Sequence, residues 1–148
     1  IGDNLSGTSM SMASLMLQGK IPLVPDAAFP MVDVRDVAKL HVAALKIEKA
    51  ANQRFIAAES KPRSFQEIGA ILNKLGYTGP STRLAPNLLL KLLSYFDREA
   101  EGMLGFLGMK VYADNSATKE VFNWEPLPFK QSIKDTATFI ESLIPVKK

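Results

Sequence analysis

The residue types in this sequence that could carry chemistry lie mostly between positions 33 and 41. Asp33 and Asp36 stand three positions apart, with Arg35 between them. Two nearby carboxylates can act as paired acid and base catalysts. Aspartates at this spacing also suit the N-cap and third position of a helix, where they satisfy free backbone N–H groups and the positive end of the helix dipole. We interpret both aspartates as helix caps.

Arg35 and His41 each have two readings. The Arg35 guanidinium could reach a substrate at a cleft, or it could pair with a neighbouring carboxylate. His41 is the only histidine, and it falls on the predicted inward face of its helix. We interpret it as a core or boundary histidine, because a single histidine without cysteine or an adjacent acidic cluster supports no metal site.

The composition limits the class of protein. With 148 residues, 47% hydrophobic and 22% charged, the chain is expected to form one compact lobe with a core of its own. No apolar run is long enough for a transmembrane helix. The absence of cysteine excludes disulfides and thiolate sites and suits a reducing cytoplasm. The net charge of +3 comes from scattered lysines, which predicts no nucleic-acid surface.

Hydrophobic periodicity and capping residues predict about five helices. They cover residues 9–18, ended by Gly19; 34–47; 65–75, opened by a capping box at Ser64 and ended by Gly76; 115–122, ended by Asn123; and 129–143. A further apolar helix is predicted over residues 87–96 behind Pro86.

Only short β-strands are predicted, over residues 54–58 and 111–113. Residues 21–30 hold three prolines and are expected to be an extended connector with few backbone hydrogen bonds. Isolated strands of this length cannot form a stable sheet alone, so some are expected to pair outside this chain. The chain also begins at Ile1 rather than methionine, as expected of a piece of something larger.

Several segments, in order, resemble one enzyme family. The string VDVRDVA, residues 32–38, with His41 and Ala44 behind it, resembles a segment of the extended short-chain dehydrogenases/reductases. It looks most similar to the dihydroflavonol-reductase-like and aldehyde-reductase-like branch, within the NAD-dependent epimerase/dehydratases. Residues 53–56, QRFI, and residues 115–126, which begin NS and end in NWEP, are similar to later segments of that family, and the resemblance spans about residues 1–143. Two positions depart from the family pattern: Asp3 stands where a proline is usual, and Asn123 where a glycine is usual.

The resemblance implies an α/β enzyme of Rossmann type, of which this chain is the helix-rich substrate-binding lobe with a few short strands. The family's glycine-rich phosphate turn and its Tyr-x-x-x-Lys set belong upstream of this region. Neither motif occurs in the 148 residues: the three tyrosines lack a lysine four positions on, and Gly102, Gly105 and Gly108 have the wrong spacing. We therefore predict no catalytic residue in this chain and no catalysis by it alone.

By resemblance, one residue is assigned to the cofactor and five to the substrate. Ser9 corresponds to a serine near the cofactor, although an ordinary helix N-cap explains it equally, and the two readings are compatible. Candidate substrate contacts are Arg35 and members of an apolar set, Leu92, Phe96, Met103 and Phe106. Apolar walls with few polar groups suit a small-molecule pocket, but plain core or an exposed lobe interface would explain the same residues.

The expected parent enzyme transfers a hydride between NAD(P)H and a small apolar or aromatic ketone or aldehyde. A nucleotide-sugar epimerase or dehydratase lobe and a non-catalytic binding module are the alternatives, because one scaffold hosts several functions. The expected partners are the substrate and the missing cofactor-binding domain. No binding to nucleic acid or to a membrane is expected, and the expected location is the cytoplasm. NAD(P) is expected to bind the parent and not this chain alone. Exposed apolar surface predicts some self-association.

Overall fold

The computed structural model describes residues 5, 7–86, 88, 95 and 105–148, and the chain divides into two compact units. Unit 1 combines Ile1–Ala27, Ser64–Met109 and Ile133–Lys148, and unit 2 combines Ala28–Arg63 and Lys110–Ser132. Each unit is therefore assembled from segments that are distant in sequence. The lobe expected from the length of the chain consists of two bodies, and each is described by itself.

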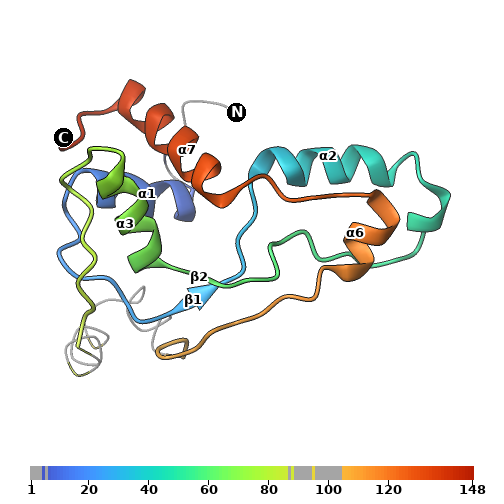
Figure 1. Ribbon diagram of the computed structural model, residues 1–148, viewed down its shortest axis with the longest axis horizontal. Coiled ribbons are helices and arrows are strands. Elements are labelled where there is room, and N and C mark those ends of the chain that lie inside the picture. Colours follow the sequence, from blue (N-terminus) through green and yellow to red (C-terminus); the bar gives the residue numbers. More distant parts are fainter. Residues whose placement is uncertain (1–4, 6, 87, 89–94, 96–104) are drawn as a thin grey trace. The chain divides into compact units, whose positions relative to one another are not determined.

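Unit 1 is built on three helices: α1 (Thr8–Leu17), α3 (Phe65–Lys74) and the greater part of α7 (Phe129–Leu143) (Figure 1). Each helix places apolar side chains in the core, and the most buried are Met16, Leu17, Leu72, Ala137 and Ile140. The loop after α3 passes so close to α1 that a Cβ on Gly79 would lie 2.4 Å from the Leu17 carbonyl oxygen. Only glycine fits at this crossing.

The helix boundaries in unit 1 follow the local signals closely, with one correction. Ser64 caps α3 by accepting a hydrogen bond from the Glu67 N–H at 3.1 Å, and Gly19 and Gly76 follow their helices with φ of 69° and 95°. The interpretation of Ser9 as an N-cap is wrong. Gly7 is the N-cap of α1 and Ser9 lies inside the first turn, because the backbone becomes helical at Thr8.

The proline-containing connector is more hydrogen-bonded than expected. The Val24 N–H donates to the Arg83 carbonyl, and the Val24 carbonyl accepts from the Ala85 N–H, both at 2.8 Å. The Asp26 carbonyl accepts from the Gly108 N–H at 2.7 Å. The prediction of an unpaired connector is wrong, because the prolines leave the N–H and C=O groups between them free to pair.

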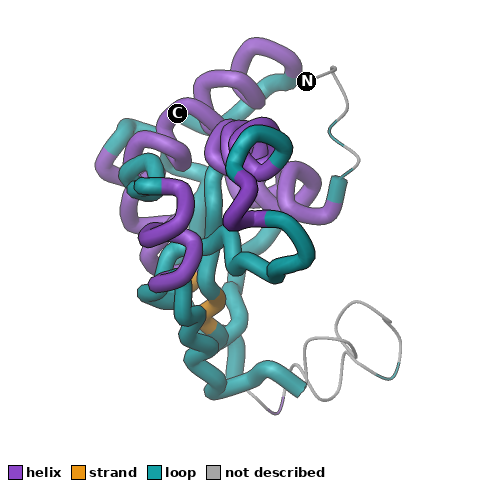
Figure 2. Tube along the Cα trace, turned by 90° about the vertical axis from the view of Figure 1, so that its right-hand side faces the viewer, coloured by secondary structure: helices purple, strands orange, loops and turns teal. Residues whose placement is uncertain are grey.

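Unit 2 holds two helices and short strand pieces. They are α2 (Val34–Ala44), a 3-10 turn (Glu48–Ala50), α6 (Ser116–Phe122) and β1 (Ala28–Phe29), while β2 (Arg63–Ser64) straddles the division between the units in sequence. β1 and β2 form a two-stranded sheet, and Ala28 also bridges to Lys110. Figure 2 shows how little of the described chain is strand. The fold class predicted from the sequence, a helix-rich α/β lobe, is confirmed.

The core of unit 2 joins α6 to α2 and to residues 54–58. α2 and α6 are in contact, and the rings of Phe55 and Phe122 meet edge-on with centroids 4.7 Å apart. Asn123 ends α6 in the left-handed conformation, φ 47° and ψ 45°, as predicted. The strands predicted over 54–58 and 111–113 do not form, because the described residues offer them no continuous neighbouring strand. The helix predicted over residues 87–96 lies almost wholly outside the described residues.

Candidate functional site

The start of α2 carries a locked ion pair. Asp33 is the N-cap and accepts the Arg35 backbone N–H at 2.8 Å, while the Arg35 guanidinium donates to both carboxylate oxygens at 2.8 and 2.9 Å. These hydrogen bonds from Arg35 hold the pKa of the Asp33 carboxyl well below its ordinary value, against the opposing effect of burial. Asp33 is therefore a fixed anion rather than a proton acceptor, which agrees with its interpretation as a cap.

The Arg35 guanidinium is bound to Asp33, yet the Arg35 side chain is largely exposed. Its side chain is 47% exposed, whereas that of Asp33 is 7% exposed. The pairing of Arg35 with a carboxylate is thus confirmed, while contact with a substrate stays a prediction. Both readings are compatible, because a guanidinium presents several N–H groups and Asp33 uses two of its nitrogens.

Asp36, in the first turn of α2, is only 3% exposed. Its carboxylate accepts a hydrogen bond from the backbone N–H of Leu127 at 2.6 Å. Lys39 stands at 4.0 Å from the other carboxylate oxygen. This arrangement fastens the chain between α6 and α7 to α2. The interpretation of Asp36 as a cap of free helix N–H groups is therefore wrong, although its charge does lie in the first turn of α2.

Hydrophobic periodicity predicts one inward face of α2, formed by Val37, Leu40, His41, Ala44 and Leu45, and this is wrong at three positions. Ala44 is exposed. His41 is exposed, with its Nδ1 atom 2.8 Å from the Val37 carbonyl oxygen, and Leu45 is 88% exposed. Leu40 is buried as predicted. The prediction fails here because apolar residues occupy more than half of the circumference of α2, so periodicity alone does not say which of them face the core.

Exposed apolar side chains gather around the connector in unit 1. Leu84 bridges Val24 on one side of the connector, and the turn carrying Phe106 and Met109 is tied to Asp26 nearby. Leu84, Phe106 and Met109 are 41%, 45% and 47% exposed. All three are thus exposed apolar side chains on segments whose backbone is bonded to the connector.

Phe106 is one of the predicted substrate contacts, and it is partly exposed. The other three apolar candidates, Leu92, Phe96 and Met103, lie outside the described residues. Nearby in the sequence, Leu88 is 80% exposed and Tyr95 is 85% exposed.

The described residues form no nucleotide cradle. Such a cradle needs a strand, a glycine-rich turn and a helix N-terminus in succession. The one strand that leads directly into a helix in the described part, β2 into α3, does so through Arg63, Ser64 and Phe65 without a glycine. Exposed Ser9 in the first turn of α1 offers a helix N-terminus, which suits an anionic group but does not make a complete site.

A cluster that sequence reasoning missed joins Tyr77 to the C-terminus. The Tyr77 hydroxyl donates to the Glu141 carboxylate at 2.8 Å; Lys148 pairs with Glu141 and lies 5.5 Å from the Tyr77 ring centroid. Burial, and then Glu141, raises the pKa of the Tyr77 phenol. The contacts of this cluster fasten the segment after α3 to α7 and to Lys148. No local signal could reveal it, because Tyr77 and Glu141 are 64 positions apart.

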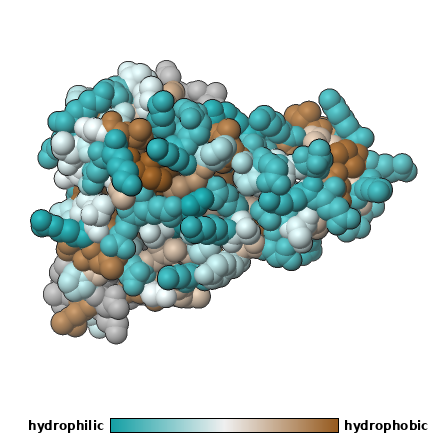
Figure 3. Space-filling model, viewed as in Figure 1, coloured by the Kyte–Doolittle hydropathy of each residue, from teal (hydrophilic) through white to brown (hydrophobic). Residues whose placement is uncertain are grey.

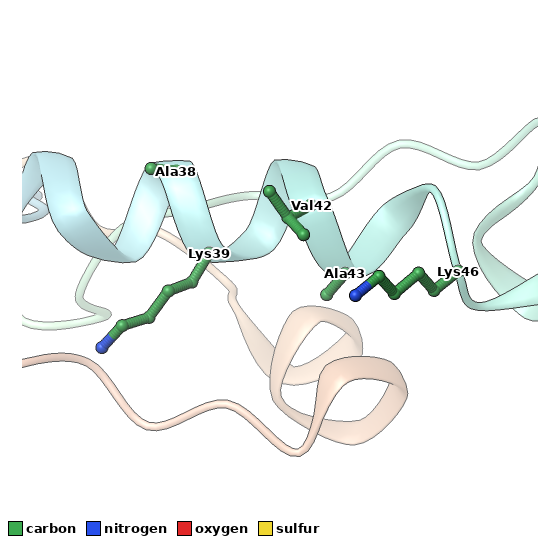
Figure 4. Close-up of a pocket in the computed structure, with 5 residues that line it drawn as sticks. All are labelled: Ala38, Lys39, Val42, Ala43 and Lys46. Atoms are coloured by element: carbon green, nitrogen blue, oxygen red, sulfur yellow. The ribbon is translucent and has the colours of Figure 1, made fainter.

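The remaining candidate is an open apolar hollow along α2, lined by Ala38, Lys39, Val42, Ala43 and Lys46 (Figure 4). All its walls come from α2 and the turn after it, so it encloses no ligand. In the described part of the chain, no group of three or more metal-binding side chains occurs, and none of the helices has the length and apolarity that crossing a membrane requires.

Comparison with solved structures shows where the fold belongs. Gre2 from Candida albicans, solved in complex with NADPH, matches 96% of this chain with a TM-score of 0.65 and 22% identity. A second solved protein, gox2253, matches 92% of the chain with a TM-score of 0.68 and 18% identity. The likeness establishes the fold. No family model and no curated protein matches the sequence.

The chain spans less than half of the two solved proteins, 39% of Gre2 and 44% of gox2253. Nearly all of this chain is therefore accounted for by the Gre2-like fold, while more than half of each solved chain has no counterpart in it. This chain thus corresponds to only a part of each of the two solved proteins.

Proposed function

We propose that this chain is the substrate-binding lobe of an NAD(P)-dependent oxidoreductase that reduces a small apolar or aromatic ketone or aldehyde, similar to a dihydroflavonol reductase. The observation that carries the proposal is the match of 96% of this chain to 39% of a protein solved with NADPH. The VDVRDVA string at residues 32–38 supports the same family. Since neither Tyr-x-x-x-Lys nor a glycine-rich turn occurs in the 148 residues, the proposal assigns the chemistry to another part of the enzyme.

In this proposal the chain supplies the wall of the substrate pocket. Leu84, Phe106 and Met109 are exposed apolar side chains on backbone that is hydrogen-bonded in place, which is what a wall needs to orient an apolar substrate and exclude water. Arg35 adds a cation whose Nε and one terminal nitrogen are hydrogen-bonded to Asp33. Leu92, Phe96 and Met103 extend the wall on the sequence evidence alone.

The cofactor belongs to the other half of the enzyme in this proposal. When bound, it supplies the hydride, and Ser9 at the start of α1 approaches its anionic part. The setting is the cytoplasm, in keeping with a chain without cysteine.

The proposal is tested by joining this chain to what it lacks. In a chimera, the chain replaces the matching part of Gre2 and keeps the rest of that protein. We expect the chimera to bind NADPH and reduce aromatic ketones, and the 148-residue chain alone to do neither. Turnover by the purified 148-residue chain would contradict the assignment of the chemistry to the rest of the enzyme. Epimerisation of a nucleotide sugar by the chimera would show that the proposed reaction is wrong.

A pair of substitutions tests the wall itself. Phe106→Ala in the chimera should raise KM for an aromatic ketone about tenfold, because a lost apolar contact of that size costs about 1.4 kcal/mol. Leu143→Ala, which removes a similarly exposed side chain from α7, is the control and should leave KM unchanged. Equal effects of the two substitutions on KM would contradict the proposal that Phe106 lines the substrate pocket.

A further inference from the structure

Lys147, near the end of the sequence, lies between two segments of unit 1. Its backbone N–H donates to the carbonyl of Leu17, the last residue of α1, at 3.0 Å, and its own carbonyl accepts from the Thr78 N–H at 2.9 Å. Figure 1 shows this end of the chain, in red, beside the loop that follows α3. The backbone of Lys147 therefore joins the end of α1 to the segment after α3.

Lys148 is fastened by a different set of contacts. Its ammonium group pairs with the Glu141 carboxylate on α7 and lies 5.5 Å from the Tyr77 ring centroid. The Tyr77 hydroxyl donates to the same carboxylate at 2.8 Å. Hydrogen bonds from Lys148, and then from Tyr77, lower the pKa of Glu141, so the carboxylate is an anion at neutral pH. We call Lys147 and Lys148 together the strap.

The two segments that the strap joins continue side by side beyond it. The Ser81 hydroxyl donates to the Pro22 carbonyl at 2.6 Å. Further along, Val24 makes hydrogen bonds of 2.8 Å with the residues on both sides of Leu84. The Leu84 side chain is one of the exposed apolar side chains of the proposed substrate wall. A continuous path of hydrogen-bonded segments thus leads from the strap to that wall.

At the end of this path that carries the strap, the two segments are close but not bonded to each other. Gly79 packs directly against the Leu17 carbonyl. Among the described residues, no backbone hydrogen bond joins residues 17–20 directly to residues 77–80. Van der Waals contact between two such atoms is weak, so it does little to keep the segments from separating. The strap supplies the hydrogen bonds that hold this end together.

The strap is held by hydrogen bonds and charge rather than by burial. Lys147 and Lys148 are both exposed. In Figure 3, hydrophilic atoms cover the region where Figure 1 places this end of the chain. Substitution of an exposed side chain leaves no cavity and usually changes stability little. An effect of changing the strap therefore arises from its hydrogen bonds and its ion pair.

We propose that Lys147 and Lys148 are positioning residues for the substrate wall. The strap holds the segment after α3 against the connector that follows α1, and thereby holds Leu84 in place for the substrate. The proposal rests on the proposed function and adds to it two residues that do not touch the substrate themselves. A wall binds the substrate before and during the reaction alike, so a loosened wall raises KM and leaves kcat unchanged.

Lys147→Pro tests the strap in the chimera with the rest of Gre2. Proline removes the N–H that donates to Leu17. We expect KM for an aromatic ketone to rise by up to about tenfold, as for Phe106→Ala, while kcat and the affinity for NADPH change by less than about twofold. Lys147→Ala is the control, because it keeps both backbone hydrogen bonds, and should leave KM unchanged. An unchanged KM in a folded Lys147→Pro chimera would overturn the proposal.

Lys148→Glu tests the ion pair, and it decides the matter if Lys147→Pro does not fold. The substitution places a second anion beside Glu141, so the strap should loosen and KM should rise. Lys148→Arg keeps the cation and should leave KM unchanged. Lys134→Glu makes the same change of charge at another exposed lysine of α7 and should also leave KM unchanged. Equal rises in KM for Lys148→Glu and Lys134→Glu would show an effect of net charge and contradict the proposal.

Hydrogen exchange distinguishes positioning from a general loss of stability. In the Lys147→Pro chimera, the amides of Val24 and Ala85 should exchange faster, because the two segments separate more often. The Glu59 amide of unit 2, bonded to the Met31 carbonyl, should keep its rate. Faster exchange at all three amides with an unchanged KM would mean that the strap only stabilises the fold, and the positioning role would be wrong.

The outcomes separate the two proposals. If the unsubstituted chimera reduces the ketone and the strap substitutions leave KM unchanged, the positioning role is wrong and the proposed function stands. If the unsubstituted chimera binds no NADPH, the proposed function fails and the positioning role fails with it. Exchange at Val24 and Ala85 in the 148-residue chain then still shows whether the strap holds the two segments together.

Discussion

The Asp36 carboxylate accepts a hydrogen bond from the Leu127 backbone N–H, 91 positions further along the chain, at 2.6 Å. The carboxylate is almost fully buried, so this contact ties the segment before α7 to the first turn of α2. It is one of several contacts through which unit 2 is assembled from two distant segments.

Removal of this contact should destabilise unit 2. Asp36→Ala leaves the Leu127 N–H without its partner, and a buried unsatisfied donor costs about 1–3 kcal/mol. Urea unfolding measures the loss. Lys39→Ala removes only the exposed cation at 4.0 Å and should cost less than about 0.5 kcal/mol. Comparable losses in the two variants would contradict the role given to Asp36.

The ion pair at the start of α2 should make stability depend on acid. The pKa of Asp33 is lower in the folded chain than its ordinary 3.8, so its contribution is complete above that pH and is lost as pH falls below it. Asp33→Asn should flatten this part of the curve of unfolding free energy against pH. Arg35→Gln should flatten it partly, because the Arg35 backbone N–H and Ser132 still hydrogen-bond the carboxylate. If the unfolding free energy of Asp33→Asn still falls at acid pH as it does in the unsubstituted chain, the ion pair is not the cause of that fall.

Tyr77 should lose its proton at higher pH in the folded chain than in the unfolded one. Its raised pKa means that the stability from this group is complete below pH 10 and is lost as pH rises above it. Phenolate absorbance of the folded chain should therefore show one late step, which Tyr77→Phe removes. The same substitution should cost about 1 kcal/mol through the lost bond to Glu141. A late step that persists in Tyr77→Phe would contradict its assignment to Tyr77.

The crossing between Gly79 and α1 should tolerate no side chain. Gly79→Ala places a Cβ against backbone atoms of Leu17 and Gly19 that cannot swing aside. The expected cost is about 2–3 kcal/mol, which lowers the melting temperature by about 4–12 °C. Gly105→Ala meets nothing within 4 Å and is the matched control. Equal melting temperatures for the two variants would show that the loop can move away from α1.

Local signals were sufficient wherever the cause of a structure is local. The Ser64 cap, the glycines after α1 and α3, the left-handed Asn123 and the bounds of α7 all follow from neighbouring residues. The candidate site was accessible only in part. The sequence indicated Arg35 and Phe106, but not that Val24 and Asp26 bond the distant segments around Leu84 and Gly108 to one connector.

The sequence by itself determined the helices of the described residues, most of their caps and the absence of a tyrosine–lysine set, because each depends on residues a few positions apart. The tertiary structure decided which side of α2 is buried, which strands form and what Tyr77 contacts. These depend on partners tens of positions away in the sequence. Periodicity shows that α2 carries many apolar residues. Only packing shows that Val34, Val42 and Leu45 are the exposed ones among the described residues.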